Sequence, residues 1–96
     1  IWVEFKNVRG DEGWLYGGAN IIAFDMPEEG GFSIVDRHEL AFFCEKHVRD
    51  EVVDHKKDAY LKKYTRKDRQ DVISILKLHD IKNLMSYRVW EYDQRY

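Results

Sequence analysis

Cysteine is almost absent from this chain of 96 residues, because Cys44 is the only one. A single cysteine excludes an internal disulfide and fits a reducing, intracellular compartment. The four histidines, His38, His47, His55 and His79, are scattered and form no zinc-ligand spacing. The sequence also has no signal-peptide pattern and no apolar run near the ~18 residues of a membrane span. We therefore expect a cytoplasmic protein without a membrane partner.

The composition is that of one small folded domain spanning residues 1–96. Hydrophobic residues make up 44% of the chain, which is enough for one core, and charged residues make up 35%. Residues 1–54 carry five Lys or Arg and twelve Asp or Glu, while residues 55–96 carry eleven and six. The acidic half suits metal binding and the basic half suits phosphate binding, although solvated faces of an ordinary domain have the same composition.

The most informative pattern is at the start, where a carboxylate and an amine interrupt an apolar strand. Side chains alternate along a strand, so Glu4 and Lys6 project side by side from the face opposite Val3 and Phe5. Their Cα atoms are roughly 6 to 7 Å apart, so both side chains can reach one phosphate. Glu4 can bind Mg²⁺ and Lys6 can hold a phosphate or a water. The same pair is also common on the wet face of a half-buried strand.

The middle of the chain predicts a hairpin followed by a helix. Residues 19–25 and 32–35 are predicted as strands, joined by a turn at 26–31. Asp36 is the predicted helix N-cap, with Glu39 in the capping-box position. Apolar side chains then recur at helical spacing, and we expect an inert buried thiol among them: Leu40, Phe43, Cys44, His47 and Val48.

The last part of the chain is strongly charged. Residues 54–71 predict a short helix leading into a loop, and aromatic side chains between Lys and Arg are typical of a nucleic-acid contact surface. An exposed lysine-rich helix that binds nothing has the same composition. Residues 72–78 predict a strand, and a helix is expected from His79 or Asp80, with these apolar positions: Ile81, Leu84, Met85 and Trp90.

The order of elements predicts an α/β or α+β fold with a central mixed sheet of about four strands flanked by two or three helices. A strand with Glu-x-Lys, a glycine-containing connection (GWLY, residues 13–16) and a strand at 19–24 (ANIIAF) resemble the second half of a PD-(D/E)xK nuclease domain, particularly its phage-encoded and resolvase-like members. The basic segment 64–73 is similar to the approach to a late strand in these proteins. The resemblance covers most of the chain and implies a restriction-endonuclease-like sheet.

The resemblance implies an activity and a set of site residues. It makes Glu4 a metal-binding carboxylate and Lys6 the catalytic lysine of a Mg²⁺- or Mn²⁺-dependent endonuclease that hydrolyses DNA phosphodiester bonds. Duplex, branched and single-stranded DNA all stay open as substrates. The predicted contacts to nucleic acid are Lys62, Lys63, Arg66, Lys67 and Arg69.

One element of the family pattern is missing. The family carries an acidic residue on a strand before Glu-x-Lys, and the three residues before Glu4 are not acidic. Asp11, Glu12 or Asp25 can replace it only if the loops fold back toward Glu4. We otherwise expect the acid to come from a preceding segment of the chain, from a partner chain or from the second copy in a homodimer.

Two further classes of function stay open beside the nuclease. One is a nucleic-acid-binding module of nuclease-like fold that does not cleave, and it predicts salt-sensitive binding through the basic residues 62–69. The other is a protein-interaction module, for which exposed aromatic side chains are the expected sign. The aromatic candidates are Trp14, Tyr16, Trp90, Tyr92 and Tyr96.

Overall fold

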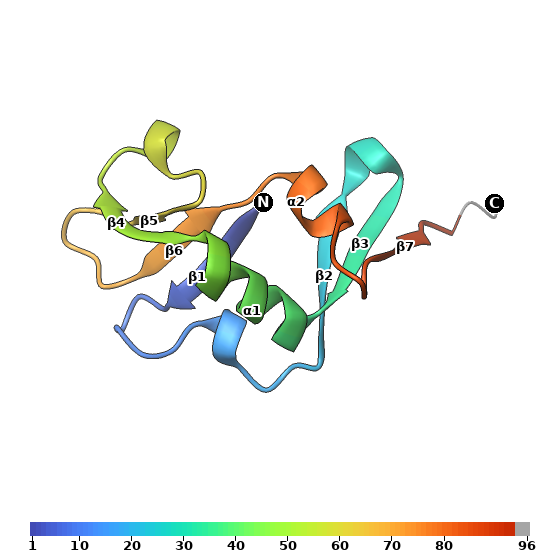
Figure 1. The fold of residues 1–96 in the computed structure, drawn as a ribbon, viewed down its shortest axis with the longest axis horizontal. Helices are drawn as coiled ribbons and strands as arrows, with labels where there is room; N and C mark the ends of the chain where they lie inside the picture. The colour runs from blue at the N-terminus through green and yellow to red at the C-terminus, as the bar shows by residue number, and fades with distance from the viewer. Residues whose placement is uncertain (94–96) are drawn as a thin grey trace.

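The computed structural model describes residues 1–93, which fold into two β-sheets and two α-helices (Figure 1). The strands are β1 (Trp2–Lys6), β2 (Ile21–Met26), β3 (Gly31–Asp36), β4 (Arg49–Val53), β5 (Lys62–Tyr64), β6 (Val72–Ile75) and β7 (Arg88–Glu91). The α-helices are α1 (Arg37–His47) and α2 (Leu78–Lys82), and three short 3₁₀ turns are η1 (Trp14–Tyr16), η2 (Pro27–Glu29) and η3 (Lys56–Asp58).

The two sheets differ in topology. Sheet A has four strands in the order β1-β6-β5-β4, and it is mixed because β4 and β5 run parallel while the other neighbours are antiparallel. Sheet B has three antiparallel strands in the order β2-β3-β7. The predicted mixed sheet of about four strands is confirmed within an α+β fold. The second sheet was not predicted.

The predicted hairpin and helix in the middle of the chain are confirmed. β2 and β3 pair antiparallel from Ile21 with Asp36 to Met26 with Gly31, and η2 connects them through Gly30 in the left-handed region (φ 75°). Asp36 ends β3 and caps α1, because its Oδ1 accepts the backbone N–H of Glu39 at 2.8 Å. The chain therefore turns directly from sheet B into α1.

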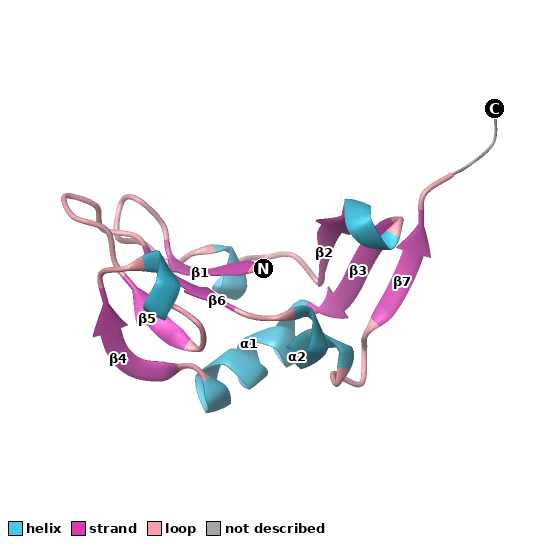
Figure 2. Cartoon of the chain, turned by 90° about the horizontal axis from the view of Figure 1, so that it is seen from above, coloured by secondary structure: helices cyan, strands magenta, loops and turns pink. Residues whose placement is uncertain are grey.

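The hydrophobic core lies where α1 meets both sheets. Figure 2 shows α1 and α2 on one side of the molecule, with sheet A toward one end and sheet B toward the other. β1 contributes Val3 and Phe5 to the core, and β3 contributes Val35. The buried side chains that complete it are Leu15, Leu40, Ala41, Cys44, Val48, Leu76 and Ile81. Within residues 1–93, no helix is long and apolar enough to cross a membrane.

Two predicted segments are wrong in detail. Residues 54–71 contain only the turn η3 and the strand β5, because Lys62, Lys63 and Tyr64 pair with β4 and β6 instead of continuing a helix. The last helix ends at Lys82, and residues 88–91 form β7 beside β3. Met85, which we expected on the apolar face of that helix, is 97% exposed. Tertiary strand pairing decides the structure of both segments.

Candidate functional site

β1 contains both Glu4 and Lys6. Val3 and Phe5 are buried in the core, while Glu4 is half-buried and Lys6 is exposed. Glu4 is held by the start of η1, since its Oε1 accepts the backbone N–H of Trp14 at 3.2 Å. Within residues 1–93, no Lys, Arg or His forms an ion pair with this carboxylate.

Gly13 allows the chain to pass directly over Glu4. Its N–H donates to the carbonyl oxygen of Phe5 at 2.8 Å, next to a bridge between Lys6 and Glu12. A Cβ atom at Gly13 would lie 2.5 Å from the backbone oxygen of Glu4 and 2.7 Å from its Cγ. Only glycine fits at position 13, because the chain there lies so close to β1. This contact restricts both the backbone and the side chain of Glu4.

The pairing of β1 with β6 is irregular at the site. Glu4 pairs with Ile73 and Lys6 pairs with Val72, so β1 has one more residue than β6 over this interval. Such a bulge bends the strand and increases its twist, and bulges are common beside active sites. Here the bulge interrupts the alternation between Glu4 and Lys6, because Lys6 pairs with Val72, which packs against the core. A side-by-side projection of the two side chains therefore stays a prediction.

The structure also places the three acidic residues considered as replacements for the missing acid. Glu12 lies beside Lys6 through the backbone bridge, and the backbone carbonyl of Asp11 accepts the N–H of Asn7 across the preceding turn. Asp25 lies in sheet B, where it accepts a hydrogen bond from Tyr92 and lines a cavity of about 370 Å³ with Leu78. Within residues 1–93, no three His, Cys, Asp or Glu side chains converge to hold a metal ion.

Asp71 is an acidic residue that the sequence did not single out. It lies two residues before Ile73, the partner of Glu4, so strand alternation places it on the same face of sheet A. Its Oδ2 forms an ion pair with Arg66, while its Oδ1 is buried without a hydrogen-bond partner among the described residues. An enclosed, paired carboxylate is not available to a hydrated ion in this conformation.

Glu4 therefore fits a Mg²⁺ ion as one ligand of several. Mg²⁺ in proteins is commonly held by one or two carboxylates, with waters and substrate phosphate oxygens completing an octahedron. The described part of the chain supplies the first carboxylate and the neighbouring amine of Lys6. No group of three such side chains is found within residues 1–93, so the origin of a second acid stays a prediction.

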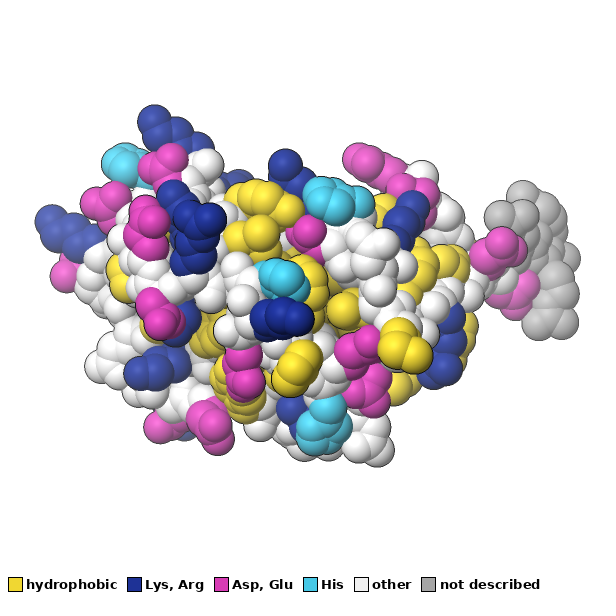
Figure 3. Space-filling view, viewed as in Figure 1, with side chains coloured by type: hydrophobic (Ala, Val, Ile, Leu, Met, Phe, Trp, Pro, Cys, Tyr) yellow, Lys and Arg dark blue, Asp and Glu magenta, His cyan; other side chains and the backbone are white. Residues whose placement is uncertain are grey.

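The predicted basic surface is partly neutralised. Lys62 forms an ion pair with Glu51 at 3.1 Å, and Lys63 forms one with Asp50 at 2.8 Å. Arg66 is paired with Asp71, whereas Lys67 and Arg69 are exposed in the turn that follows β5. Figure 3 shows basic and acidic side chains interspersed over this end of the molecule. Contact of these five residues with nucleic acid stays a prediction.

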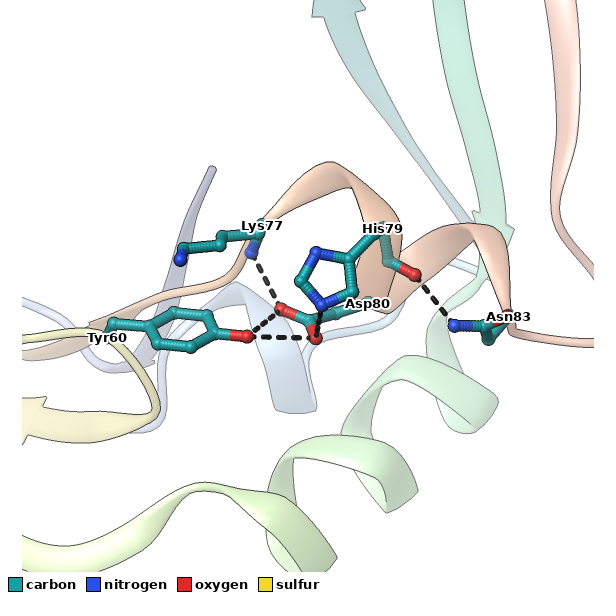
Figure 4. A network of polar contacts seen from close by, with 5 residues as sticks. All are labelled: Tyr60, Lys77, His79, Asp80 and Asn83. Atoms are coloured by element: carbon teal, nitrogen blue, oxygen red, sulfur yellow. Dashed lines mark hydrogen bonds and ion pairs between the residues drawn. The ribbon is translucent and has the colours of Figure 1, made fainter.

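A second polar cluster joins α2 to the segment before β5 (Figure 4). The carboxylate of Asp80 accepts the Tyr60 hydroxyl at 2.9 and 3.0 Å and the backbone N–H of Lys77 at 2.8 Å, and His79 Nε2 lies 3.2 Å away. Burial, followed by the hydrogen bond to Asp80, raises the pKa of Tyr60. The Lys77 amine lies 4.4 Å from the centre of the Tyr60 ring. These contacts anchor a five-residue helix.

Comparison with known proteins adds no relative. No protein-family model matches the chain, and no similar protein was found among curated sequences or solved structures. A function for this chain has to be argued from the residues and geometry described above.

Proposed function

We propose that this chain carries the Glu-x-Lys part of a metal-dependent nuclease that hydrolyses DNA phosphodiester bonds. The observation that supports this most is the state of Glu4. It is half-buried, fixed by the Trp14 amide and not paired with a cation of residues 1–93, although the exposed amine of Lys6 is on the same strand. A carboxylate whose charge is not balanced by a side-chain cation can take a divalent cation as its counter-charge.

The two side chains have separate roles in this proposal. Glu4 holds one position in the coordination of a Mg²⁺ or Mn²⁺ ion and is prevented from rotating away by the Trp14 amide. Lys6 places a positive charge against the non-bridging oxygens of the scissile phosphate, where charge increases in the transition state. The bound ion supplies Lewis acidity and a water of lowered pKa.

The edge position of β1 is compatible with the missing acid. β1 is the terminal strand of sheet A within residues 1–93, and only its end near Phe5 and Lys6 is covered, by residues 12–13. The edge beside Trp2 and Val3 can therefore accept another strand. In our proposal that strand brings the second carboxylate, from another segment, from a partner chain or from a second copy.

A nuclease assay on the full-length protein tests the proposal. We expect Mg²⁺- or Mn²⁺-dependent cleavage of linear, branched or single-stranded DNA, and a loss of at least about 100-fold in Glu4→Gln and Lys6→Met, as for other groups that stabilise transition-state charge. Glu29→Gln in η2 and Lys82→Ala in α2 are matched exposed controls in other parts of the fold. Cleavage at the wild-type rate by both β1 variants would contradict the proposal.

A protein-interaction module is the second candidate, and sheet B favours it. Trp90 is 53% exposed on β7, with the Arg88 guanidinium 5.9 Å from its ring centre. Phe32, the β3 partner of Trp90, packs edge-on against Tyr92, with the two ring centres 5.5 Å apart. Interfaces favour Trp, Tyr and Arg. Trp14 and Tyr16 are half-buried against the core, and Tyr96 lies outside the described residues.

A further inference from the structure

The face of sheet A that points away from the core has an apolar centre. Trp2 of β1 pairs with Ile75 of β6, while Ile73 of β6 pairs with both Glu4 and Tyr64. Alternation puts these side chains on one face and Val3, Ser74 and Leu76 on the other. None of the four apolar residues on this face belongs to the hydrophobic core: Trp2, Tyr64, Ile73 and Ile75.

Two aromatic rings lie side by side on this face. The ring centres of Trp2 and Tyr64 are 5.9 Å apart with 31° between their planes, although β6 separates their strands. Both rings must therefore lean across the Ile73 and Ile75 positions of β6. Trp2 is large and apolar and still keeps 38% of its surface exposed. The pair forms a partly exposed aromatic platform, which we call the Trp2–Tyr64 platform.

Charged groups surround the platform. Glu4 is directly opposite Ile73 on this face, and Lys6 follows on β1 beyond the bulge. Lys62 and Arg66 flank Tyr64 at alternate positions, and Lys67 and Arg69 extend into the exposed turn. Lys62 and Arg66 are balanced by Glu51 and Asp71. Among residues 1–93, Lys6, Lys67 and Arg69 form no ion pair and lie around the aromatic rings, together with the carboxylates of Glu4 and Asp68.

We propose that the Trp2–Tyr64 platform binds unpaired nucleotides by stacking, which makes single-stranded DNA, or a single-stranded region of branched DNA, the substrate of the Glu4–Lys6 strand. Sequence-tolerant binding of single strands combines aromatic side chains that stack on bases with cations along the backbone. The bases of an intact duplex are stacked on one another and cannot reach a flat sheet face. A stacked base would bring its phosphate toward Lys6 and Glu4. This assignment of substrate rests on the proposed function, whereas the binding itself does not need a metal.

Binding is measured with the full-length protein in EDTA, so that cleavage plays no part. The probe is a fluorescent oligo(dT) of about 12 nucleotides, a length within the site sizes of single-strand-binding folds. We expect Trp2→Leu and Tyr64→Leu each to weaken binding about 10-fold, while Trp2→Phe, which still stacks, retains most of it. Trp90→Leu is the matched control, because it removes an exposed tryptophan from sheet B. A duplex of the same length should bind at least about 10-fold more weakly at equal salt.

The outcomes separate the two proposals. Loss of cleavage with retained oligo(dT) binding in Glu4→Gln supports both. Single-strand binding that depends on Trp2 and Tyr64, in a protein that cleaves nothing, supports the platform and contradicts the nuclease. Equal binding by wild type and by folded Trp2→Leu and Tyr64→Leu variants contradicts the platform, as does equal affinity for duplex. Absence of DNA binding at low salt also contradicts the platform proposal and favours a protein partner for this face.

Discussion

At the scale of single residues, Glu39 shows how one carboxylate connects distant parts of the chain. It lies in the first turn of α1, and it accepts hydrogen bonds from the backbone of Met85 at 2.8 Å and of Ser86 at 2.9 Å, and from the Ser86 hydroxyl. The hydrogen bond from the Ser86 side chain is the main reason that the pKa of Glu39 lies below its ordinary value of 4.5. The ionised form is thus favoured by folding.

The lowered pKa of Glu39 predicts a defined pH dependence of stability. The stabilisation is complete above pH 4.5, the ordinary value, and is lost as the pH falls through the lower pKa of the folded state. We expect Glu39→Gln to lower the free energy of unfolding by about 1 kcal/mol at pH 7, because solvent reaches the carboxylate. The difference should shrink toward pH 3 in urea denaturation. Glu29→Gln, on the exposed turn η2, should not show this trend.

Cys44 should be chemically inert in the folded protein. It is fully buried, and burial raises the pKa of its thiol to about 12. At pH 8 the thiol therefore stays protonated and shielded, and it should not react with iodoacetamide over hours. Full reaction in 6 M guanidinium chloride is the control. Rapid alkylation of the native protein would show that α1 opens readily from the core.

Local residue roles were more predictable than those that depend on tertiary contacts. The Asp36 cap and the buried Cys44 follow from helix patterns, and both predictions are confirmed. Glu39 was expected to close a capping box, but its side chain binds residues 85 and 86 instead. Asp71 was not singled out, because its burial and its ion pair with Arg66 arise only in the folded structure. The residue type at a single position does not indicate which distant residues its side chain will contact.

At the scale of elements, the crossing of Gly13 over β1 gives the sharpest test of site geometry. Gly13→Ala should displace η1 from Glu4, since the new Cβ would overlap the Glu4 backbone and side chain. We expect a loss of about 1–3 kcal/mol in stability, as for other overpacked sites, together with loss of any activity that depends on Glu4. Gly18→Ala is the matched control in the same loop, because no atom lies within 4 Å of its Cβ. Equal effects of the two variants would contradict this account.

Elements with strong local signals were predicted, and elements defined by their neighbours were not. The β2–β3 hairpin and α1 have alternation, turn residues and a cap within their own sequence. β5 consists of Lys62, Lys63 and Tyr64, which show no apolar alternation, and it is a strand because β4 and β6 lie on either side. β7 likewise depends on β3. A single sequence shows propensity but not pairing partners.

At the scale of the whole molecule, the two sheets share one core and should unfold together. Leu40 of α1 is fully buried in the core that also contains Val3 of sheet A and Val35 of sheet B. Leu40→Ala should therefore lower stability by about 2–5 kcal/mol and shift the unfolding of both sheets equally. Trp2 reports on sheet A and Trp90 on sheet B, so the fluorescence of single-tryptophan variants, in which Trp14 and one of these two are replaced by Phe, measures this. Separate midpoints for the two reporters would show that the sheets unfold independently.

The overall architecture could be anticipated only in part. A mixed four-stranded sheet with helices is present, but the predicted hairpin belongs to a second sheet that is completed by β7. The residues that join the sheets are buried Leu, Val and Cys side chains of ordinary helical and strand patterns. Such patterns identify which face is buried and do not identify which sheet covers it. The restriction-endonuclease-like arrangement stays a prediction.

Sheet B ends in β2 and β7, and neither outer edge is paired within residues 1–93. Each edge presents a row of backbone donors and acceptors to any other molecule in solution. Arg88 and Glu91 lie at the two ends of β7, and Asp25 lies on β2. These charged side chains disfavour pairing of either edge with another strand. Salt screens such charges over about 10 Å at 0.1 M. We therefore expect a higher ionic strength to favour association of concentrated stocks through the open edges of one small sheet.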